Sequence, residues 1–251
     1  MDVITHNRSA WNTRVREGKS AYTQPVTSAQ VEAARRGDWQ LYVTPAPVPR
    51  PWLGDVVGKD VLCLASGGGQ QGPVLAAAGA TVTVFDLADE QLAQDRLVAE
   101  RDGLAVQTVQ GDMRDLSAFA DASFDLVVHP VSNCFIPDVN PVWHESFRVL
   151  RPGGKLISGR VNPLLYALGG DDSLNIQNNV PYSDAEALSE AERAKYLKSG
   201  LALEFGHSLG DLIGGQLRAG FVLSCFEESG FPGKAVDAYL PTLFATCALR
   251  V

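Results

Sequence analysis

Long apolar runs, clustered cysteines and an excess of basic residues are all missing from this 251-residue sequence. No segment approaches the roughly 20 apolar residues that span a bilayer, and no basic stretch leads into an apolar run at the N-terminus, so we expect a cytoplasmic protein without a membrane partner. The 21 Lys and Arg against 29 Asp and Glu leave a net charge of −8. Non-specific nucleic-acid binding relies on overall positive charge, so we expect no nucleic-acid partner.

The cysteines are four and lie far apart, at positions 63, 134, 225 and 247. None of them has the short spacing to another that zinc or redox motifs require. Isolated cysteines in apolar surroundings are most often buried free thiols, so the sequence predicts no metal site.

The first fifty residues differ in composition from the rest of the chain. They are polar with scattered aromatics, and they end in a segment with prolines at 45, 47, 49 and 51. Alternate prolines favour extended backbone. We therefore expect helical pieces around residues 7–18 and 27–37 and an N-terminal cover segment over 1–50, followed by the main domain at 51–251.

The main domain alternates short apolar runs with helical stretches. The runs at 61–65, 81–86, 105–110, 124–129 and 155–161 predict parallel strands, and this alternation predicts an α/β fold with helices on both faces of one sheet. The helix at 89–101 is expected to bury Leu92, Leu97 and Val98 and to expose Asp95. A further helix is predicted to start at Asn140, which precedes a proline.

The alternation stops after residue 161. Residues 163–200 predict an insertion that covers a pocket, with a helix that starts at a capping box formed by Ser183 and Glu186. Residues 201–206 are strand-like, a helix is expected at 209–219, and strands are expected at 221–226 and 243–251.

A glycine cluster follows the first predicted strand and opens a helix. It reads Ala65-Ser66-Gly67-Gly68-Gly69-Gln70-Gln71-Gly72, and glycines there allow a tight turn and close approach of a ligand to the backbone. Asp86 lies 19 residues beyond Gly67, at the end of the second strand, where a carboxylate can accept hydrogen bonds from a ribose diol. The combination predicts a cofactor that contains adenosine.

The same glycines also fit the fingerprint of dinucleotide-binding proteins, so a nicotinamide-dependent oxidoreductase is an alternative. Two observations count against it. The third strand ends in Gly111-Asp112-Met113, a carboxylate beside an apolar side chain that suits an adenine ring. The chain also has no Tyr-x-x-x-Lys pair of the short-chain dehydrogenase type.

Together these segments resemble the class I S-adenosylmethionine-dependent methyltransferases, over residues 55–160 and 205–250. The matching segments are Leu62 to Gly69, Asp86, Asp112-Met113 and Leu150-Arg151-Pro152-Gly153-Gly154. The resemblance implies a Rossmann-like, doubly wound and mostly parallel seven-stranded sheet with an antiparallel last strand. It also implies S-adenosylmethionine as cofactor, and it is closest to a little-characterised bacterial group that shares the Ala-Ser-Gly-Gly-Gly-Gln-Gln motif.

The resemblance also assigns residues to the cofactor site. They are Ala65, Ser66, Gly67, Gly69, Gln70, Asp86, Leu87, Asp112, Met113 and His129. Two positions depart from the family pattern, since Cys63 stands where an acid is usual and Ala65 where glycine is usual. The acid commonly helps to organise the amino-acid end of the cofactor, and Gln70 or Gln71 is a possible substitute.

The resemblance implies in-line methyl transfer, for which alignment of the reacting atoms is the main contribution. The ends of strands four and five then nominate His129, Ser132, Asn133, Arg160, Asn162 and Tyr166. His129 is the candidate base, because an unperturbed histidine titrates near neutrality; a structural strand-end histidine is the alternative.

The expected substrate residues are Trp11, Tyr22, Asn133, Asn162 and Tyr166, although Trp11 and Tyr22 are equally explained as anchors of the N-terminal segment. We expect a small-molecule acceptor and a monomer or homodimer. The alternatives are an RNA or protein methyltransferase and a cofactor-binding module without activity.

Overall fold

The computed structural model describes residues 2–168, 174–231, 233 and 235–251. Its centre is a seven-stranded sheet in the order β3-β2-β1-β4-β5-β9-β8. The strands are β1 (Asp60–Leu64), β2 (Thr81–Asp86), β3 (Val106–Gln110), β4 (Phe124–His129), β5 (Leu150–Val161), β8 (Phe221–Ser229) and β9 (Leu243–Arg250). Neighbours from β3 to β5 are parallel, and β9 runs antiparallel to both β5 and β8. The predicted fold class is therefore confirmed.

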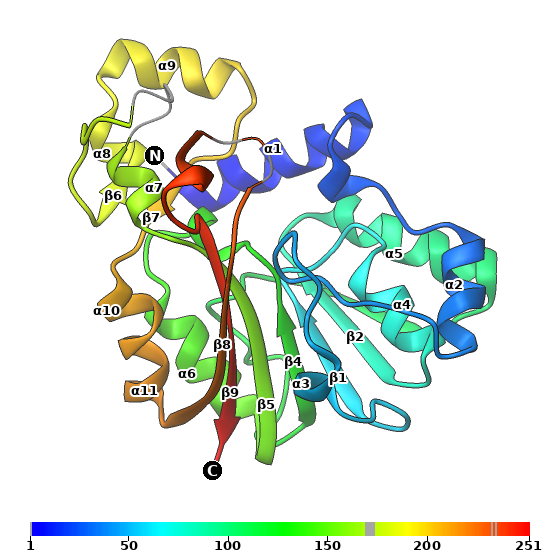
Figure 1. Ribbon diagram of the computed structural model, residues 1–251. Coiled ribbons are helices and arrows are strands. Elements are labelled where there is room, and N and C mark those ends of the chain that lie inside the picture. The colour runs from blue at the N-terminus through cyan, green and yellow to red at the C-terminus, as the bar shows by residue number, and fades with distance from the viewer. Residues whose placement is uncertain (1, 169–173, 232, 234) are drawn as a thin grey trace.

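Helices cover both faces of this sheet (Figure 1). One face carries α2 (Ser28–Arg35), α4 (Gln71–Ala77) and α5 (Asp89–Asp102), and the other carries α6 (Asn140–Val149), α10 (Leu209–Leu212) and α11 (Gly214–Ala219). Each face has its own buried apolar cluster, because parallel strands present apolar side chains on both sides. The predicted helix at 209–219 is broken, and Ile213 separates its two halves.

The first helix, α1 (Val3–Glu17), lies across the carboxyl edge of the sheet in Figure 1. Asn12 fastens it to α5, because its amide nitrogen donates to Asp89 Oδ1 (2.8 Å) and its Oδ1 accepts from the backbone nitrogen of Glu90 (3.1 Å). None of the helices in the described part of the chain is long and apolar enough to cross a membrane.

Beyond β5 the chain forms a small lobe beside α1 (Figure 1). It contains α7 (Leu164–Ala167), β6 (Tyr182–Ser183), α8 (Asp184–Ala187), α9 (Glu190–Lys198) and β7 (Phe205–Gly206). The strand-like stretch 201–206 contributes two residues to a separate pair with β6 and none to the main sheet. The predicted capping box at Ser183 is wrong: Ser183 makes no capping bond, and the box forms at Ser189 with Glu192.

Two further expectations for the main sheet need correction. In α5 the buried residues are Gln91, Leu92, Asp95 and Val98, whereas Leu97 is about half exposed. Asp95 therefore faces the interior and Leu97 the solvent, the reverse of the expectation. The fifth strand begins at Leu150 rather than 155, since the Arg-Pro-Gly-Gly segment continues the strand through a register shift opposite Phe124 and Leu126.

The proline-rich segment is more than a cover. It includes α3 (Arg50–Leu53), and Leu41, Val43, Trp52 and Leu53 belong to the buried cluster on one face of the sheet. The chain crosses β5 so closely that a Cβ on Gly159 would lie 1.9 Å from the carbonyl oxygen of Val43. The glycine at 159 is thus required by this crossing.

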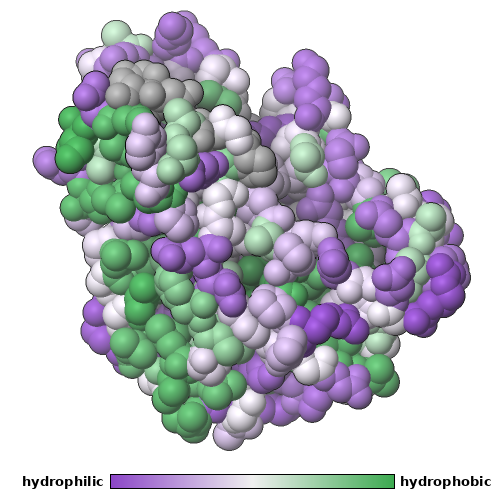
Figure 2. All heavy atoms as spheres, viewed as in Figure 1, coloured by the Kyte–Doolittle hydropathy of each residue, from purple (hydrophilic) through white to green (hydrophobic). Residues whose placement is uncertain are grey.

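The sheet ends at the edge strand β8. Figure 2 shows apolar side chains gathered over β8 and α11, where Leu217, Val222 and Phe226 are each about half exposed. The helices therefore cover both faces of the sheet, but the apolar side chains at the β8 edge remain exposed to water in the single chain.

The crossing at Gly159 gives a direct test of the fold. Gly159→Ala should lower the free energy of unfolding by about 1–3 kcal/mol or more, because the added methyl overlaps backbone that cannot give way easily. Urea denaturation followed by circular dichroism measures the change. Gly214→Ala, at the start of α11, is the matched control: its Cβ would meet only the end of the exposed Arg218 side chain, which can move aside, so it should not destabilise the protein. Equal stability of wild type and Gly159→Ala would contradict the described crossing.

Candidate functional site

The glycine turn begins where β1 ends at Leu64. Ala65 takes a left-handed backbone conformation (φ 47°), and its backbone nitrogen donates to the carbonyl of Phe85 in β2 (2.7 Å). A residue with a Cβ pays roughly 1–2 kcal/mol to enter this region, and alanine has the smallest such side chain. Ala65 thus adopts the left-handed backbone conformation that favours glycine, the usual residue at this position in the methyltransferases that the sequence resembles.

Asp86 holds the turn from the end of β2. Its Oδ2 accepts from the backbone nitrogen of Gly67 and its Oδ1 from that of Ala88, both at 2.9 Å. A Cβ on Gly67 would lie 3.1 Å from the carboxyl group of Asp86 and 2.8 Å from Gln91 Cβ. Burial raises the pKa of Asp86, and the backbone amides of Ala88, Gly67 and Leu87 act in the opposite direction.

Asp95 holds the turn from the other side and was missed by the sequence analysis. It is fully buried, and its Oδ2 accepts from the backbone nitrogen of Gly68 (3.0 Å), while Oδ1 has no partner. Burial raises its pKa to about 7, against the opposing effect of the Gly69 and Gly68 amides. The spacing of positions 92, 95 and 98 places Asp95 on the buried face of α5, and this spacing was the available signal.

The rest of the glycine turn is occupied by the chain itself. A Cβ on Gly68 would lie 2.9 Å from the Tyr22 carbonyl oxygen, and a Cβ on Gly69 would lie 2.7 Å from Pro25 Cβ. The Gln70 side-chain amide donates to the carbonyls of Ala21 (2.7 Å) and Gln24 (2.9 Å). Gln70, an expected cofactor residue, thus uses its side-chain nitrogen to fasten the N-terminal segment to the turn.

Strand β3 ends beside Asp86, because the backbone nitrogen of Gly111 donates to the Asp86 carbonyl (3.0 Å). Asp112 follows and forms a salt bridge with Arg114 (2.6 Å), in which the guanidinium contacts both carboxylate oxygens. Met113 is buried in the apolar cluster. The predicted adenine contacts therefore lie at the same edge as Asp86, with the carboxylate of Asp112 already neutralised.

Two other expected cofactor residues make contacts close to the turn. Ser66 Oγ donates to Gln71 Oε1 (3.1 Å), and the carbonyl of Leu87 accepts from the side-chain nitrogen of Gln110 (3.1 Å). Ser66 lies just beyond the end of β1 and Leu87 just beyond the end of β2, and both make hydrogen bonds to neighbouring protein groups.

His129 ends β4 and is fully buried. Its Nδ1 lies 3.0 Å from the carbonyl oxygen of Leu64, and because a carbonyl can only accept, Nδ1 carries the proton. Nε2 has no partner, and burial lowers the pKa of the ring to about 4. His129 is therefore neutral near pH 7 and a much weaker base than an exposed histidine, although its Nε2 can accept a hydrogen bond.

The expected substrate residues after β4 and β5 divide into two kinds. Asn133, in a short 3-10 helix (Asn133–Phe135), is buried with an unpartnered Nδ2. Asn162 is used by the fold, since its side chain donates to the Pro241 carbonyl and accepts from the Leu164 backbone nitrogen. Tyr166 donates to Glu204 Oε2 (2.9 Å) and stacks on Tyr182, with ring centroids 5.5 Å apart.

The two N-terminal aromatics also differ. Trp11 packs edge-on against Phe135 at 5.1 Å between centroids, under the guanidinium of Arg14. Trp11 thus anchors α1 next to the end of β4, as its alternative interpretation predicted. The side chain of Tyr22 is 57% exposed and lies beside the glycine turn only through its backbone.

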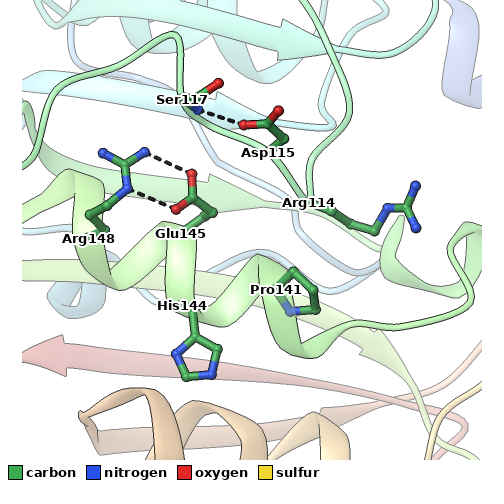
Figure 3. A pocket seen from close by; sticks show the side chains of 7 residues that line it. All are labelled: Arg114, Asp115, Ser117, Pro141, His144, Glu145 and Arg148. Carbon is green, nitrogen blue, oxygen red and sulfur yellow. Dashed lines mark hydrogen bonds and ion pairs between the residues drawn. The ribbon is translucent and has the colours of Figure 1, made fainter.

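A separate hollow of about 580 Å³ lies against the outer side of α6. Figure 3 shows its lining: Arg114, Asp115, Ser117, Pro141, His144, Glu145 and Arg148. Arg148 binds Glu145 there at 2.8 Å, so its charge is compensated. Across the described residues, no group of three or more His, Cys, Asp or Glu could hold a metal ion.

Comparison with known proteins agrees with this arrangement. A family model of the methyltransferase domain matches residues 62–158. The chain is 48% identical over 255 aligned residues to the uncharacterized methyltransferase YbaJ of Bacillus subtilis, with 99% of both chains covered. It is 33% identical over 109 residues to a ubiquinone biosynthesis O-methyltransferase of Klebsiella pneumoniae, covering 43% of this chain and 45% of that relative.

Solved structures show the same fold at low sequence identity. An S-adenosylmethionine-dependent methyltransferase from Mesorhizobium loti aligns with a TM-score of 0.63 at 20% identity, covering 80% of this chain and 95% of that one. The 1,6-didemethyltoxoflavin-N1-methyltransferase of Burkholderia thailandensis aligns with a TM-score of 0.62 at 16% identity, covering 98% and 87%.

The raised pKa of Asp95 predicts a pH-dependent stability. The folded state binds this proton more tightly than the unfolded state, so the contribution of Asp95 to stability falls as the pH rises from about 4 to about 7. Asp95→Asn removes this loss. The free energy of unfolding of the variant, relative to that of wild type, should therefore increase by about 1–3 kcal/mol from pH 5 to pH 8. Urea denaturation at both pH values measures this increase. A stability difference that does not change with pH would contradict the burial of this carboxylate.

Proposed function

Because this chain belongs to the S-adenosylmethionine-dependent methyltransferases, we propose that it transfers the methyl group of this donor to a small-molecule acceptor. The observation that carries the proposal is the contact between the Gly67 amide and the Asp86 carboxylate at the carboxyl edge of β1 and β2. Ligands of open α/β sheets bind at this edge, outside the ends of the strands.

The residues at this edge fit the donor. Each oxygen of Asp86 accepts one backbone hydrogen bond and keeps a lone pair for a ribose hydroxyl, and the side chain is partly exposed. Gly67 would bring backbone close to the donor, whereas Gly69 packs against Pro25 and Gln94 and serves the fold instead. Asp112 with Met113 would meet the adenine of the donor. Cys63 is fully buried and its pKa is raised, so it supplies no charge, whereas Asp95 provides the turn with a carboxylate from α5.

S-adenosylmethionine supplies an electrophilic methyl group on a sulfonium, so the reaction needs no covalent enzyme intermediate. The chain's contribution is to bind and orient the reactants and to exclude water. His129 and Asn133 are placed to orient the acceptor, because Nε2 of one and Nδ2 of the other are buried without partners at the end of β4. One of them accepts a hydrogen bond and the other donates one.

A small-molecule acceptor is supported by the surroundings of this edge. Helix α1 and the described residues 163–168 and 174–207 lie over the ends of β4 and β5, and the Asn7 side chain joins them by donating to the carbonyls of Phe135 and Leu203. Residues 169–173 lie outside the described part of the chain. We propose that residues 1–50 and 163–200 cover the acceptor. The similarity to a ubiquinone biosynthesis O-methyltransferase and to the fold of a 1,6-didemethyltoxoflavin-N1-methyltransferase is consistent with a small-molecule acceptor. The free cysteines favour a reducing, cytoplasmic location.

Donor binding is the first test of this proposal. Calorimetric titration should show binding of S-adenosylmethionine and S-adenosylhomocysteine in preference to NAD. Asp86→Ala should weaken donor binding by about 1–3 kcal/mol, the scale of lost hydrogen bonds to a charged group. Glu100→Ala, an exposed acid on α5, is the control and should bind like wild type. Preferential binding of NAD, or full affinity in Asp86→Ala, would overturn the assignment.

The neutral state of His129 predicts the pH profile of turnover. With a pKa of about 4, His129 does not titrate between pH 6 and 9, so transfer of labelled methyl into a metabolite extract should give parallel profiles for wild type and His129→Gln. The variant should be about fivefold slower, the effect of one neutral hydrogen bond. A fall in wild-type turnover below pH 7 that His129→Gln lacks would show that this histidine does act as a base near neutrality.

A further inference from the structure

Arg160, near the end of β5, is a fully buried cation whose guanidinium is incompletely bonded. Its Nη1 donates to Thr246 Oγ1 (2.9 Å) and to the Ser158 carbonyl (3.4 Å), whereas Nε and Nη2 have no partner. The guanidinium lies over the rings of Trp143 (4.8 Å) and Phe244 (5.6 Å). The rings attract the cation through their faces but leave its in-plane N–H groups free.

No carboxylate compensates this charge in the described part of the chain. None of the ion pairs there includes Arg160. Burial alone lowers its pKa to about 9, so the side chain stays protonated at neutral pH. A buried charge is normally paired, because the loss of hydration is expensive.

Other unpartnered polar atoms lie on the same side of the sheet as Arg160. His129 pairs with Ser158 across β4 and β5, and Ser158 pairs with Thr246 across β5 and β9. Side chains alternate along a strand, so Ser158 and Arg160 share one face of the sheet, the face that carries α6 with Trp143. The unpartnered atoms on this side are Arg160 Nε and Nη2, Ser158 Oγ, Ser146 Oγ of α6 and His129 Nε2.

Nε and Nη2 of Arg160 and the hydroxyls of Ser158 and Ser146 can all donate, and the neutral His129 Nε2 is the one atom of this group that can only accept. No group of opposite charge therefore faces the Arg160 cation among the described residues. We propose that the space between α6 and the ends of β4, β5 and β9 binds a compact monovalent anion on Arg160, either a free anion or a carboxylate carried by the methyl acceptor. Arg160 presents adjacent N–H groups in one plane, the geometry that suits a carboxylate. The hydroxyl of Ser158 supplies a further donor, and the two aromatic rings confine the ligand to the edge of the guanidinium.

The position of this site connects it to the reaction. His129 donates from Nδ1 to the Leu64 carbonyl, directly before the glycine turn. An anion on Arg160 would therefore lie beside the end of β4, next to the proposed donor site. The anion site stands independently of the proposed function, and only its use by the acceptor rests on that function.

Thermal unfolding in halide-free Hepes buffer tests the site, with sodium formate or sodium bromide added at constant ionic strength. The melting temperature of wild type should rise saturably with either anion. Arg160→Met should show no saturable rise. In the same buffer without formate or bromide it should melt at or above the wild-type temperature, because an uncompensated charge has been removed. Arg250→Met is the matched control: Arg250 also lies over a ring, Phe147 at 4.8 Å, but donates to backbone carbonyls, so its anion response should equal that of wild type.

An unchanged anion response in Arg160→Met, no response in wild type, or a lower melting temperature of Arg160→Met without anion would each overturn the proposal. If the variant does not fold, wild-type crystals soaked in bromide decide the question. An anomalous peak beside Arg160 Nε and Nη2 is expected, and water there without anomalous signal contradicts it.

Kinetics then separate the two sources of the anion. If bromide raises the KM for the methyl acceptor in the labelled-methyl reaction and leaves donor affinity unchanged, the site is assigned to a carboxylate of the acceptor. If bromide occupies the site and the KM for the acceptor does not change, the site is assigned to a free anion. Calorimetry with S-adenosylmethionine is run in parallel. Failure of donor binding would remove the proposed function and leave the anion site to be judged by bromide and formate.

Discussion

The attachment of the glycine turn to two acidic side chains is the constraint on which the site depends. Asp86 reaches the Gly67 amide from the end of β2, and Asp95 reaches the Gly68 amide from within α5. A Cβ on Gly67 would lie 3.1 Å from the Asp86 carboxyl group, and Gly68 takes a φ of 120° that favours glycine and passes close to the Tyr22 carbonyl. The fold thus explains these two glycines before any ligand is considered. Both carboxylates have raised pKa values because the turn, β2 and α5 shield them from water. The turn is therefore held in shape by the protein itself, and a bound donor meets a surface that is already organised.

The N-terminal fifth of the chain joins this turn to the rest of the molecule. Residues 21–26 pack on Gly68 and Gly69, α1 fastens to the start of α5 through Asn12, and Val43 crosses β5 at Gly159. The carboxyl edge is thus built from three parts of the sequence that lie far apart: the N-terminal segment, the first half of the sheet and the lobe beyond β5. Closing this edge with its own chain suits an enzyme that aligns small reactants away from water.

The sequence predicted β1, β2 and β4 well because each of them is a short run of mainly apolar or β-branched residues. Strand β3 alternates Val106 and Val109 with polar residues, and the turn at Gly111-Asp112-Met113 marked its end. The sequence also placed Gly67, Asp86 and Asp112 at one edge, since the carboxyl ends of parallel strands meet there. The failures share one physical cause, namely that contacts between distant segments override local rules. Ser183 and Ser189 satisfy the same capping rule, but Ser183 lies in β6 and pairs with Phe205 of β7, and the capping box forms at Ser189. Asp95 and Arg160 are charged residues that the fold buries against other elements, and Gln70 is used by the N-terminal segment.

One ligand that contains adenosine is expected to bind across the turn, the end of β2 and the end of β3. Hydrogen exchange followed by mass spectrometry, with and without S-adenosylhomocysteine, measures this directly because it reports the protection of backbone amides segment by segment. The ligand should protect residues 65–72, 86–91 and 111–114 together. Protection confined to the hollow beside α6, or protection of only one of the three segments, would contradict this expectation.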